Sequence, residues 1–186
     1  IALNLEPRLP QLLKRVVIMG GAYRVAGNVT PTAEFNVWED PEAAAQILAA
    51  PFREMIAVGL DVTNRVRLDV AVIDALEQQR EVSPAARLVH DLGRSPFWHG
   101  QGSKLALHDP IAVTAAFDPS LFTFEAAEIR VETEGPESGR TIVTGAGPVQ
   151  VATEIDQERF FRLFHARLGL PMVSAMAEGD APYSLD

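Results

Sequence analysis

Short apolar runs and a helical pattern alternate along the first part of the chain. The run Arg15–Met19 is apolar and rich in β-branched residues, and it ends at Gly20, which is typical of a buried strand followed by a loop. The run Glu54–Leu60 has the same character. Between the two runs, Asp40 predicts the N-cap of a helix over Ala43–Ala50. A strand, a helix and a second strand in this order predict parallel pairing with a crossover helix.

The remainder of the chain continues with both kinds of pattern. Helical spacing predicts helices over Leu68–Gln79, Pro84–Leu92, Asp109–Phe117 and Asp156–Leu168. Alternating residues predict strands over Thr123–Glu132 and Arg140–Thr144 around a turn at Gly135–Gly139, with a third candidate at Val149–Thr153. The sequence therefore predicts an α/β fold. We expect an open, mostly parallel, Rossmann-like sheet flanked by helices, with a β-hairpin near the C-terminus.

Composition narrows the classes of partner. The 186 residues are 47% hydrophobic and 22% charged, with a formal net charge of −9. An acidic chain of this kind is expected to bind neither nucleic acid nor an anionic membrane, because like charges repel. It contains no cysteine, which excludes disulfides and thiolate metal sites, and no apolar run of membrane-spanning length. No signal-peptide pattern is present. We therefore expect a cytoplasmic protein with neither nucleic acid nor membrane as partner.

Polar residues gather in the stretch that follows the first predicted strand. We expect residues 34–36 to be extended, with Glu34 and Asn36 pointing to one face and Phe35 to the other. Carboxylate and carboxamide groups, including that of Asn28, suit a ligand with vicinal hydroxyls. Only Arg24 supplies a nearby cation, and no glycine-rich phosphate loop is present, so a phosphorylated ligand is poorly served. An unphosphorylated sugar fits better.

Two histidine-containing segments have more than one interpretation. Asp109 begins an alanine-rich helix and could be a simple cap, as at Asp40, but His108 beside it suggests a ligand site at a strand-to-helix junction. His99, next to Trp98 in a glycine-containing loop, could contact an aromatic ligand or face solvent. The pattern alone leaves both questions open.

The combined motifs resemble a known enzyme family. The stretches MGGAYRVAGNVTPTAEFNVWEDPEAA, VGLDVT and LHDPIAV occur in the order and spacing of the inosine–uridine preferring nucleoside hydrolases. The resemblance covers essentially the whole chain, most strongly Ile1–Thr63 and Ala106–Ala116. It implies an open α/β fold and hydrolysis of the N-glycosidic bond of ribonucleosides through an oxocarbenium-like transition state. It also implies a Ca²⁺ ion that binds the ribose hydroxyls and the attacking water.

The resemblance also implies roles for individual residues. Asp109 would be a calcium ligand that contacts the ribose, and His108 would face the base and could protonate it. The ribose hydroxyls would be held by Asn28, Glu34 and Asn36, in a pocket lined by Met19 and Phe35. The catalytic set would be His108, Asp109 and Asn28, and we also assign Trp98 and His99 to substrate binding. The segment Arg94–His99 has no tyrosine where family members often contact the base, so base preference stays open.

One family feature has no counterpart in the sequence. The aspartate-rich N-terminal motif that supplies the other calcium carboxylates and the general base is missing, and Ile1 opens within an apolar helical pattern without a cap. We therefore expect residues 1–186 to be the C-terminal part of a single nucleoside hydrolase domain, inactive in isolation, from a homodimer or homotetramer. The alternatives are a non-catalytic sugar-binding or subunit-interface protein and, less favoured, a sugar or nucleotide isomerase.

Overall fold

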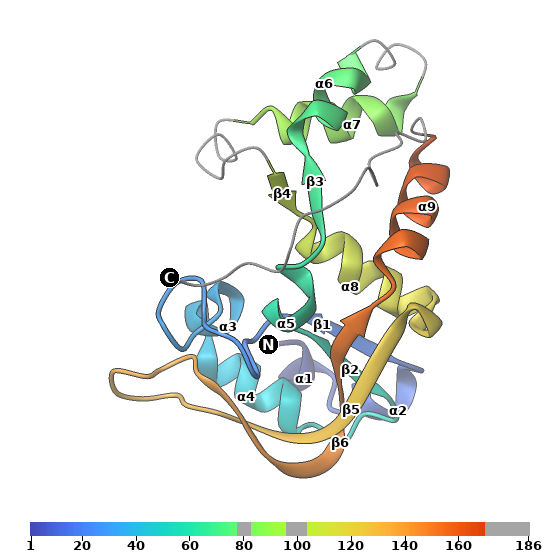
Figure 1. Ribbon diagram of the computed structural model, residues 1–186. Helices are drawn as coiled ribbons and strands as arrows, with labels where there is room; N and C mark the ends of the chain where they lie inside the picture. The colour runs from blue at the N-terminus through green and yellow to red at the C-terminus, as the bar shows by residue number, and fades with distance from the viewer. Residues whose placement is uncertain (78–82, 96–103, 170–186) are drawn as a thin grey trace. The chain divides into compact units, whose positions relative to one another are not determined.

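A computed structural model describes residues 1–77, 83–95 and 104–169 (Figure 1). The chain forms two compact units. The first contains Ile1–Leu68 and Lys104–Phe160, and the second contains Asp69–Ser103 and Phe161–Asp186. All of the predicted site residues that the structure describes lie in the first unit.

A four-stranded sheet forms the centre of the first unit. Its strands are β1 (Val16–Met19), β2 (Met55–Val58), β6 (Thr141–Ile155) and β5 (Phe122–Val131), in that spatial order. The pairs β1–β2 and β2–β6 are parallel, and β5–β6 is an antiparallel hairpin. The predicted mostly parallel sheet and its hairpin are therefore confirmed.

The hairpin corrects one prediction about strand number. The two predicted segments belong to one continuous strand, β6, which begins at Thr141 and so leaves out Arg140. The residues between them contain Pro148, which pairing across a regular ladder would exclude because proline has no N–H to donate. Here the register against β5 shifts between Ala127 and Glu128, so the extra residues form a bulge and the strand continues through it.

Helices α3 (Phe35–Glu39) and α4 (Pro41–Ala49) follow the long loop after β1. The expectation that Glu34, Phe35 and Asn36 are extended is wrong, because Glu34 is the N-cap of α3 and its side chain accepts hydrogen bonds from the backbone of the first turn. The predicted start of α4 is confirmed: Asp40 accepts a hydrogen bond from the Ala43 N–H.

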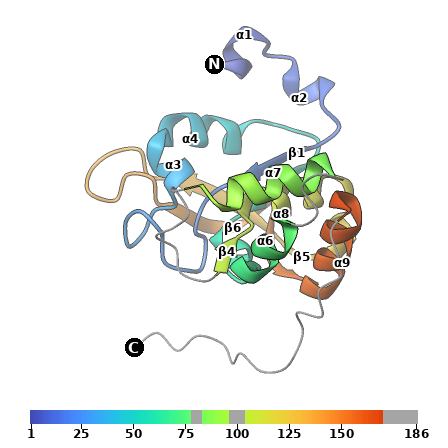
Figure 2. The same cartoon turned by 90° about the horizontal axis from the view of Figure 1, so that it is seen from above.

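Both faces of the sheet are covered. Met55 and Ala57 of β2 pack with Leu48 of α4 in one buried cluster. Because side chains alternate along a strand, Ile56 and Val58 point to the opposite face. There α8 (His108–Phe117) lies against β1 and β2. Figure 2 shows α4 and α8 on the two sides of β1.

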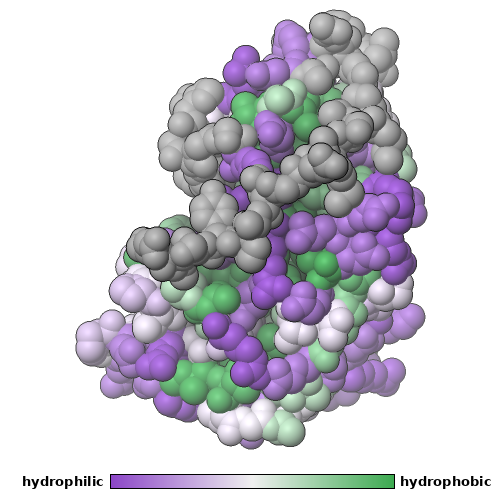
Figure 3. Space-filling view, viewed as in Figure 1, coloured by the Kyte–Doolittle hydropathy of each residue, from purple (hydrophilic) through white to green (hydrophobic). Residues whose placement is uncertain are grey.

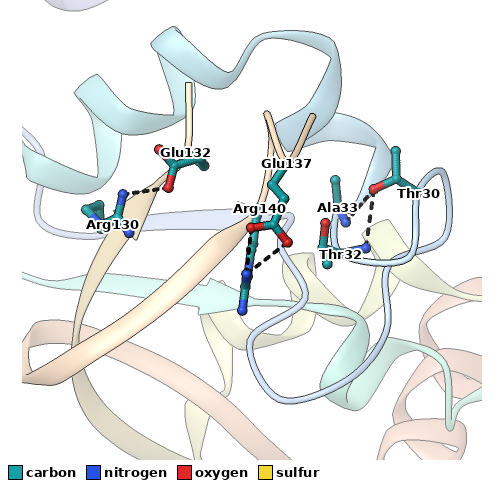
Figure 4. A network of polar contacts seen from close by, with 7 residues as sticks. All are labelled: Thr30, Thr32, Ala33, Arg130, Glu132, Glu137 and Arg140. Carbon is teal, nitrogen blue, oxygen red and sulfur yellow. Dashed lines mark hydrogen bonds and ion pairs between the residues drawn. The ribbon is translucent and has the colours of Figure 1, made fainter. Parts of the chain in front are cut away.

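The hairpin turn of β5 and β6 reaches the loop that precedes α3 (Figure 4). Arg140 pairs with Glu137 inside the turn, and its backbone forms an isolated antiparallel bridge with Ala33. On the loop side, the Thr30 hydroxyl accepts hydrogen bonds from the Thr32 and Ala33 backbone N–H groups. The loop is therefore held both by its own side chains and by the hairpin.

The remaining elements are short. In the first unit they are α1 (Ala2–Leu5), α2 (Leu9–Leu12), α5 (Leu60–Thr63) and a 3-10 turn at Pro119–Leu121. Strands β3 (Arg67–Asp69) and β4 (Lys104–Ala106) form a two-stranded sheet, and α9 (Gln157–Leu168) runs from the first unit into the second.

In the second unit, α6 (Val70–Leu76) and α7 (Pro84–Gly93) enclose a small apolar cluster around Leu76 and Ala86. The predicted helix from Leu68 begins later, at Val70, because Leu68 is in β3 and the Asp69 carboxylate caps the helix by accepting from the Ala71 N–H.

The surface of the described residues is mixed in character. On the face shown in Figure 3, hydrophobic residues form small patches separated by hydrophilic ones. None of the helices built from described residues has the length and apolarity needed to cross a membrane.

Candidate functional site

The loop between β1 and α3 is organised by a buried carboxylate. Glu34 is only 2% exposed, and its two oxygens accept hydrogen bonds from the backbone N–H groups of Gly21 (3.1 Å), Asn36 (3.0 Å) and Val37 (3.2 Å). A carboxylate has about four acceptor positions, so three of them are used by the protein. Glu34 thus joins the end of β1 to the start of α3, and about one acceptor position remains for a ligand.

A second buried carboxylate holds the same loop from the end of β2. Asp61, in α5, is 6% exposed and accepts hydrogen bonds from the backbone N–H groups of Tyr23 (2.9 Å) and Arg24 (2.8 Å). The Tyr23 hydroxyl donates to the Gly20 carbonyl oxygen. Burial raises the pKa of Tyr23, and the negative charges of Asp61 and Glu34 raise it further, so the phenol stays neutral.

The predicted sugar-binding residues lie together at the carboxyl end of β1. The Asn36 side-chain amide donates to the carbonyl oxygen (3.3 Å) and the sulfur (3.2 Å) of Met19. The Asn28 side-chain oxygen accepts from the Phe35 N–H at 2.9 Å. Asn28 and Asn36 are both exposed, as a ligand contact requires. Phe35 is 51% exposed, so the described residues do not bury its ring.

His108 is placed by its position at the start of α8 and by one hydrogen bond. Its Nδ1 lies 2.8 Å from the Thr63 hydroxyl, and Thr63 is fully buried at the end of α5. Burial lowers the pKa of His108, and Arg67 adds to that effect, while Asp109 and Glu34 act in the opposite direction. The net result is a lowered pKa, which favours a neutral ring at pH 7.

Asp109 is not a helix cap. The N-cap of α8 is Leu107, and no side chain caps this helix, whereas Asp40 does cap α4. The Asp109 side chain is exposed and has no hydrogen bond or ion pair with any residue that the structure describes. It borders a groove of about 570 Å³ that Met19 and Val17 of β1 also line. The alternative that Asp109 merely caps the helix is therefore removed.

These contacts bring the sequence-predicted residues into one region of the first unit. Met19 contacts Asn36 and shares a groove with Asp109, and the charge of Glu34 acts on His108. Trp98 and His99 lie outside the described residues. The roles assigned to each side chain in substrate binding stay predictions.

The described residues supply few of the donor groups that a calcium ion needs. Asp109 offers a hard, exposed oxygen ligand that no described residue binds, which fits one position of a calcium site. Calcium needs about six to eight oxygen ligands. Among the described residues there is no group of three or more histidine, cysteine, aspartate or glutamate side chains that could hold a metal ion. These residues alone therefore do not complete a calcium site.

The sequence did not indicate the residues that hold the loop after β1 and His108 in place. Tyr23, Asp61 and Thr63 received no role, although Asp61 and Thr63 directly follow β2. The signal was present: polar residues at the carboxyl end of a buried parallel strand lie where open α/β sheets place their ligands. The sequence alone did not show that these two side chains would turn inward.

Comparison with known proteins identifies the fold and the family. The family model described as inosine-uridine preferring nucleoside hydrolase matches residues 1–162. The non-specific ribonucleoside hydrolase RihC of Escherichia coli is 36% identical over 161 residues, covering 83% of this chain and 51% of the relative. The inosine-uridine preferring nucleoside hydrolase of Leishmania major is 34% identical over 174 residues, covering 88% and 54%.

Solved structures agree with the sequence relatives. A plant nucleoside hydrolase matches with a TM-score of 0.81 and 30% identity, over 91% of this chain and 58% of that chain. The inosine-uridine preferring nucleoside hydrolase of Bacillus anthracis matches with a TM-score of 0.74 and 29% identity, over 90% and 55%. The chain spans about half the length of the curated relatives it matches. With its family model matched over most of its length, this chain belongs to the inosine–uridine preferring nucleoside hydrolase family.

Proposed function

We propose that the natural protein hydrolyses the N-glycosidic bond of ribonucleosides, releasing the free base and ribose. Family membership supports this reaction class, because the similar proteins carry names such as non-specific ribonucleoside hydrolase. The observation that carries the proposal is the gathering of the exposed Asn36 amide, the Asp109 carboxylate, which no described residue pairs with, and His108 near the end of β1.

The sugar would be held by the residues after β1. The exposed amides of Asn28 and Asn36 supply both donors and acceptors for ribose hydroxyls, and Glu34 keeps about one free acceptor position. Their own contacts fix them: Asn36 is anchored on Met19, and Glu34 on three backbone amides. Rigid sugar contacts supply binding energy for orientation at the anomeric carbon.

Charge and proton supply would assist bond cleavage. Breaking the C–N bond builds positive charge on the sugar, which the nearby carboxylates of Asp109 and Glu34 would stabilise. A neutral purine leaves more readily if it receives a proton, and His108 is the candidate donor. The hydrogen on the neutral ring would pass to a base nitrogen as the electron pair of the C–N bond moves onto the base, and the proton that the attacking water releases would restore the ring.

Asp109 would be one ligand of a calcium ion. A bound calcium would hold the sugar hydroxyls and polarise a water molecule. No group of three or more ligating side chains lies together among the described residues, so a complete calcium site would need further ligands from other parts of the natural protein. We further propose a homodimer or homotetramer with a single nucleoside hydrolase domain.

His108→Ala in the natural protein tests this function. Purines leave poorly as anions, whereas nitrophenolate leaves well without a proton. The substitution should therefore slow inosine hydrolysis on the order of 10²–10⁴-fold. Hydrolysis of nitrophenyl riboside should stay nearly unchanged. Equal slowing of both substrates would assign His108 to sugar positioning, and the absence of free-base release from any ribonucleoside by the wild type would refute the reaction class. Chelation of divalent cations should abolish turnover of both substrates.

A further inference from the structure

The hydroxyl of Thr63 is a buried hydrogen-bonding group that contacts His108. Thr63 is fully buried, and the only hydrogen bond of its hydroxyl to a described residue is the 2.8 Å contact with His108 Nδ1. Thr114, a second buried threonine in the same unit, behaves differently, because its hydroxyl donates to the Pro110 carbonyl one helical turn earlier. The Thr63 hydroxyl does not use a helix carbonyl in this way.

This arrangement decides the direction of the hydrogen bond. A threonine hydroxyl has one hydrogen to donate, and a neutral imidazole has one N–H and one acceptor nitrogen. If His108 Nδ1 were the donor, the hydroxyl hydrogen of Thr63 would be buried without an acceptor, which is strongly disfavoured. If the hydroxyl donates to Nδ1, both groups are satisfied. Nε2 then carries the ring's only hydrogen, and it has no hydrogen bond to a described residue.

We infer that Thr63 is a positioning residue that donates to Nδ1 of His108, so that the neutral ring presents an Nε2–H to the leaving base. This inference rests on the proposed function for the identity of the acceptor. The hydrogen bond fixes both the tautomer and the rotation of the ring, because a donor on one side of the imidazole leaves the other nitrogen as the only N–H. His108 would thereby hold its transferable hydrogen at a defined atom before substrate arrives.

The first test is spectroscopic and needs no substrate. Long-range ¹H–¹⁵N spectra of the ¹⁵N-labelled natural protein, recorded at a pH above 8 where the ring is neutral, distinguish the two nitrogens of His108. We expect Nδ1 to have the chemical shift of an unprotonated, hydrogen-bonded nitrogen and Nε2 that of an N–H. In Thr63→Val the Nδ1 signal should move to the position of a nitrogen without a hydrogen-bond donor. A wild-type ring protonated at Nδ1 would overturn the inference.

The second test is kinetic. Thr63→Val should slow inosine hydrolysis by about 10–100-fold, the range typical of a partner that orients a functional histidine. It should change nitrophenyl riboside hydrolysis little, and Thr63→Ser should restore the inosine rate. Thr114→Val is the matched control, because it removes another buried hydroxyl, one that is bound to the helix backbone, and it should spare both substrates.

The outcomes separate the two proposals. Equal slowing of both substrates by Thr63→Val, or no rescue by Thr63→Ser, would overturn the positioning role. A natural protein without nucleosidase activity would remove the proposed function, while the imidazole spectrum would still decide whether Thr63 donates to Nδ1.

Discussion

At the scale of single residues, the buried polar groups of this site support the loop after β1, and the exposed ones are available to a ligand. Glu34 and Asp61 are buried and use their oxygens on backbone amides, so they shape the loop after β1. Asn28, Asn36 and Asp109 are exposed, with polar atoms available to a ligand. The sequence suggested most of these residues as candidates, but burial is what separates the supporting groups from the binding groups.

Asn36→Ala tests the assignment of this residue to the sugar. Because ribose is common to all ribonucleosides, loss of the Asn36 amide in the natural protein should lower kcat/KM for inosine, uridine and adenosine by a similar amount. The expected loss is about 1–3 kcal/mol in transition-state free energy. Asn4→Ala, an exposed substitution on α1, is the control and should leave the rates unchanged. A defect confined to one base would contradict the assignment.

Tyr23→Phe tests the electrostatics of the loop. The folded-state pKa of Tyr23 is raised, so ionisation is easier in the unfolded chain, and stability is lost as the pH rises above about 10. The variant lacks the bond to the Gly20 carbonyl and should be less stable by about 1 kcal/mol at pH 7. It should lose less stability than the wild type between pH 9 and about 11. Urea unfolding at several pH values measures both effects, and parallel curves would contradict them.

At the scale of elements, local pattern predicted the long features and failed where distant contacts decide. The apolar runs correctly predicted β1 and β2, and Asp40 correctly predicted the start of α4. Helix α3 was missed because it has only five residues and because glutamate, unlike aspartate or serine, is not a favoured N-cap. Glu34 takes that place because it also binds Gly21, a contact across 13 residues that no local pattern encodes.

The hairpin turn supplies a paired test of packing between elements. Gly135 (φ 75°) and Gly139 (φ 88°) both have a left-handed backbone. A Cβ added at Gly135 would meet nothing within 4 Å, whereas one at Gly139 would lie 2.7 Å from the Trp38 Cα in α3. Gly135→Ala should therefore cost about 1–2 kcal/mol of unfolding free energy from the backbone alone. Gly139→Ala should cost a further 1–3 kcal/mol, approximately, from overpacking.

Urea denaturation of the two glycine variants measures this difference directly. Gly145→Ala, in a part of β6 where an added Cβ also meets nothing within 4 Å and no positive φ is required, is the control for the substitution itself. Equal losses at Gly135 and Gly139 would mean that the turn does not pack against α3 as the structure describes.

At the scale of the whole molecule, the candidate site lies where the ends of parallel strands meet. The loop after β1 carries the sugar-binding candidates, and the segment after β2 carries Asp61 and Thr63. This placement follows from the parallel pairing of β1 and β2, which the sequence predicted. The sequence did not predict the groove between β1 and α8, because its walls are far apart in the chain and depend on how α8 packs.

The position of β1 at the end of the sheet order has a consequence for proton exchange. Along this strand, the N–H groups of Val16 and Gly20 donate to Glu54 and Val58, so by alternation those of Val17 and Met19 point away from β2. Among the described strands, none pairs with that outer side.

In the 186-residue chain, amide exchange with D₂O followed by NMR should therefore alternate along β1, slow at Ile18 and Gly20 and fast at Val17 and Met19. Uniform protection would mean that something covers this edge. If the same two amides become slow in the natural protein, their exchange rates would give, residue by residue, the free energy with which the sheet is extended beyond β1.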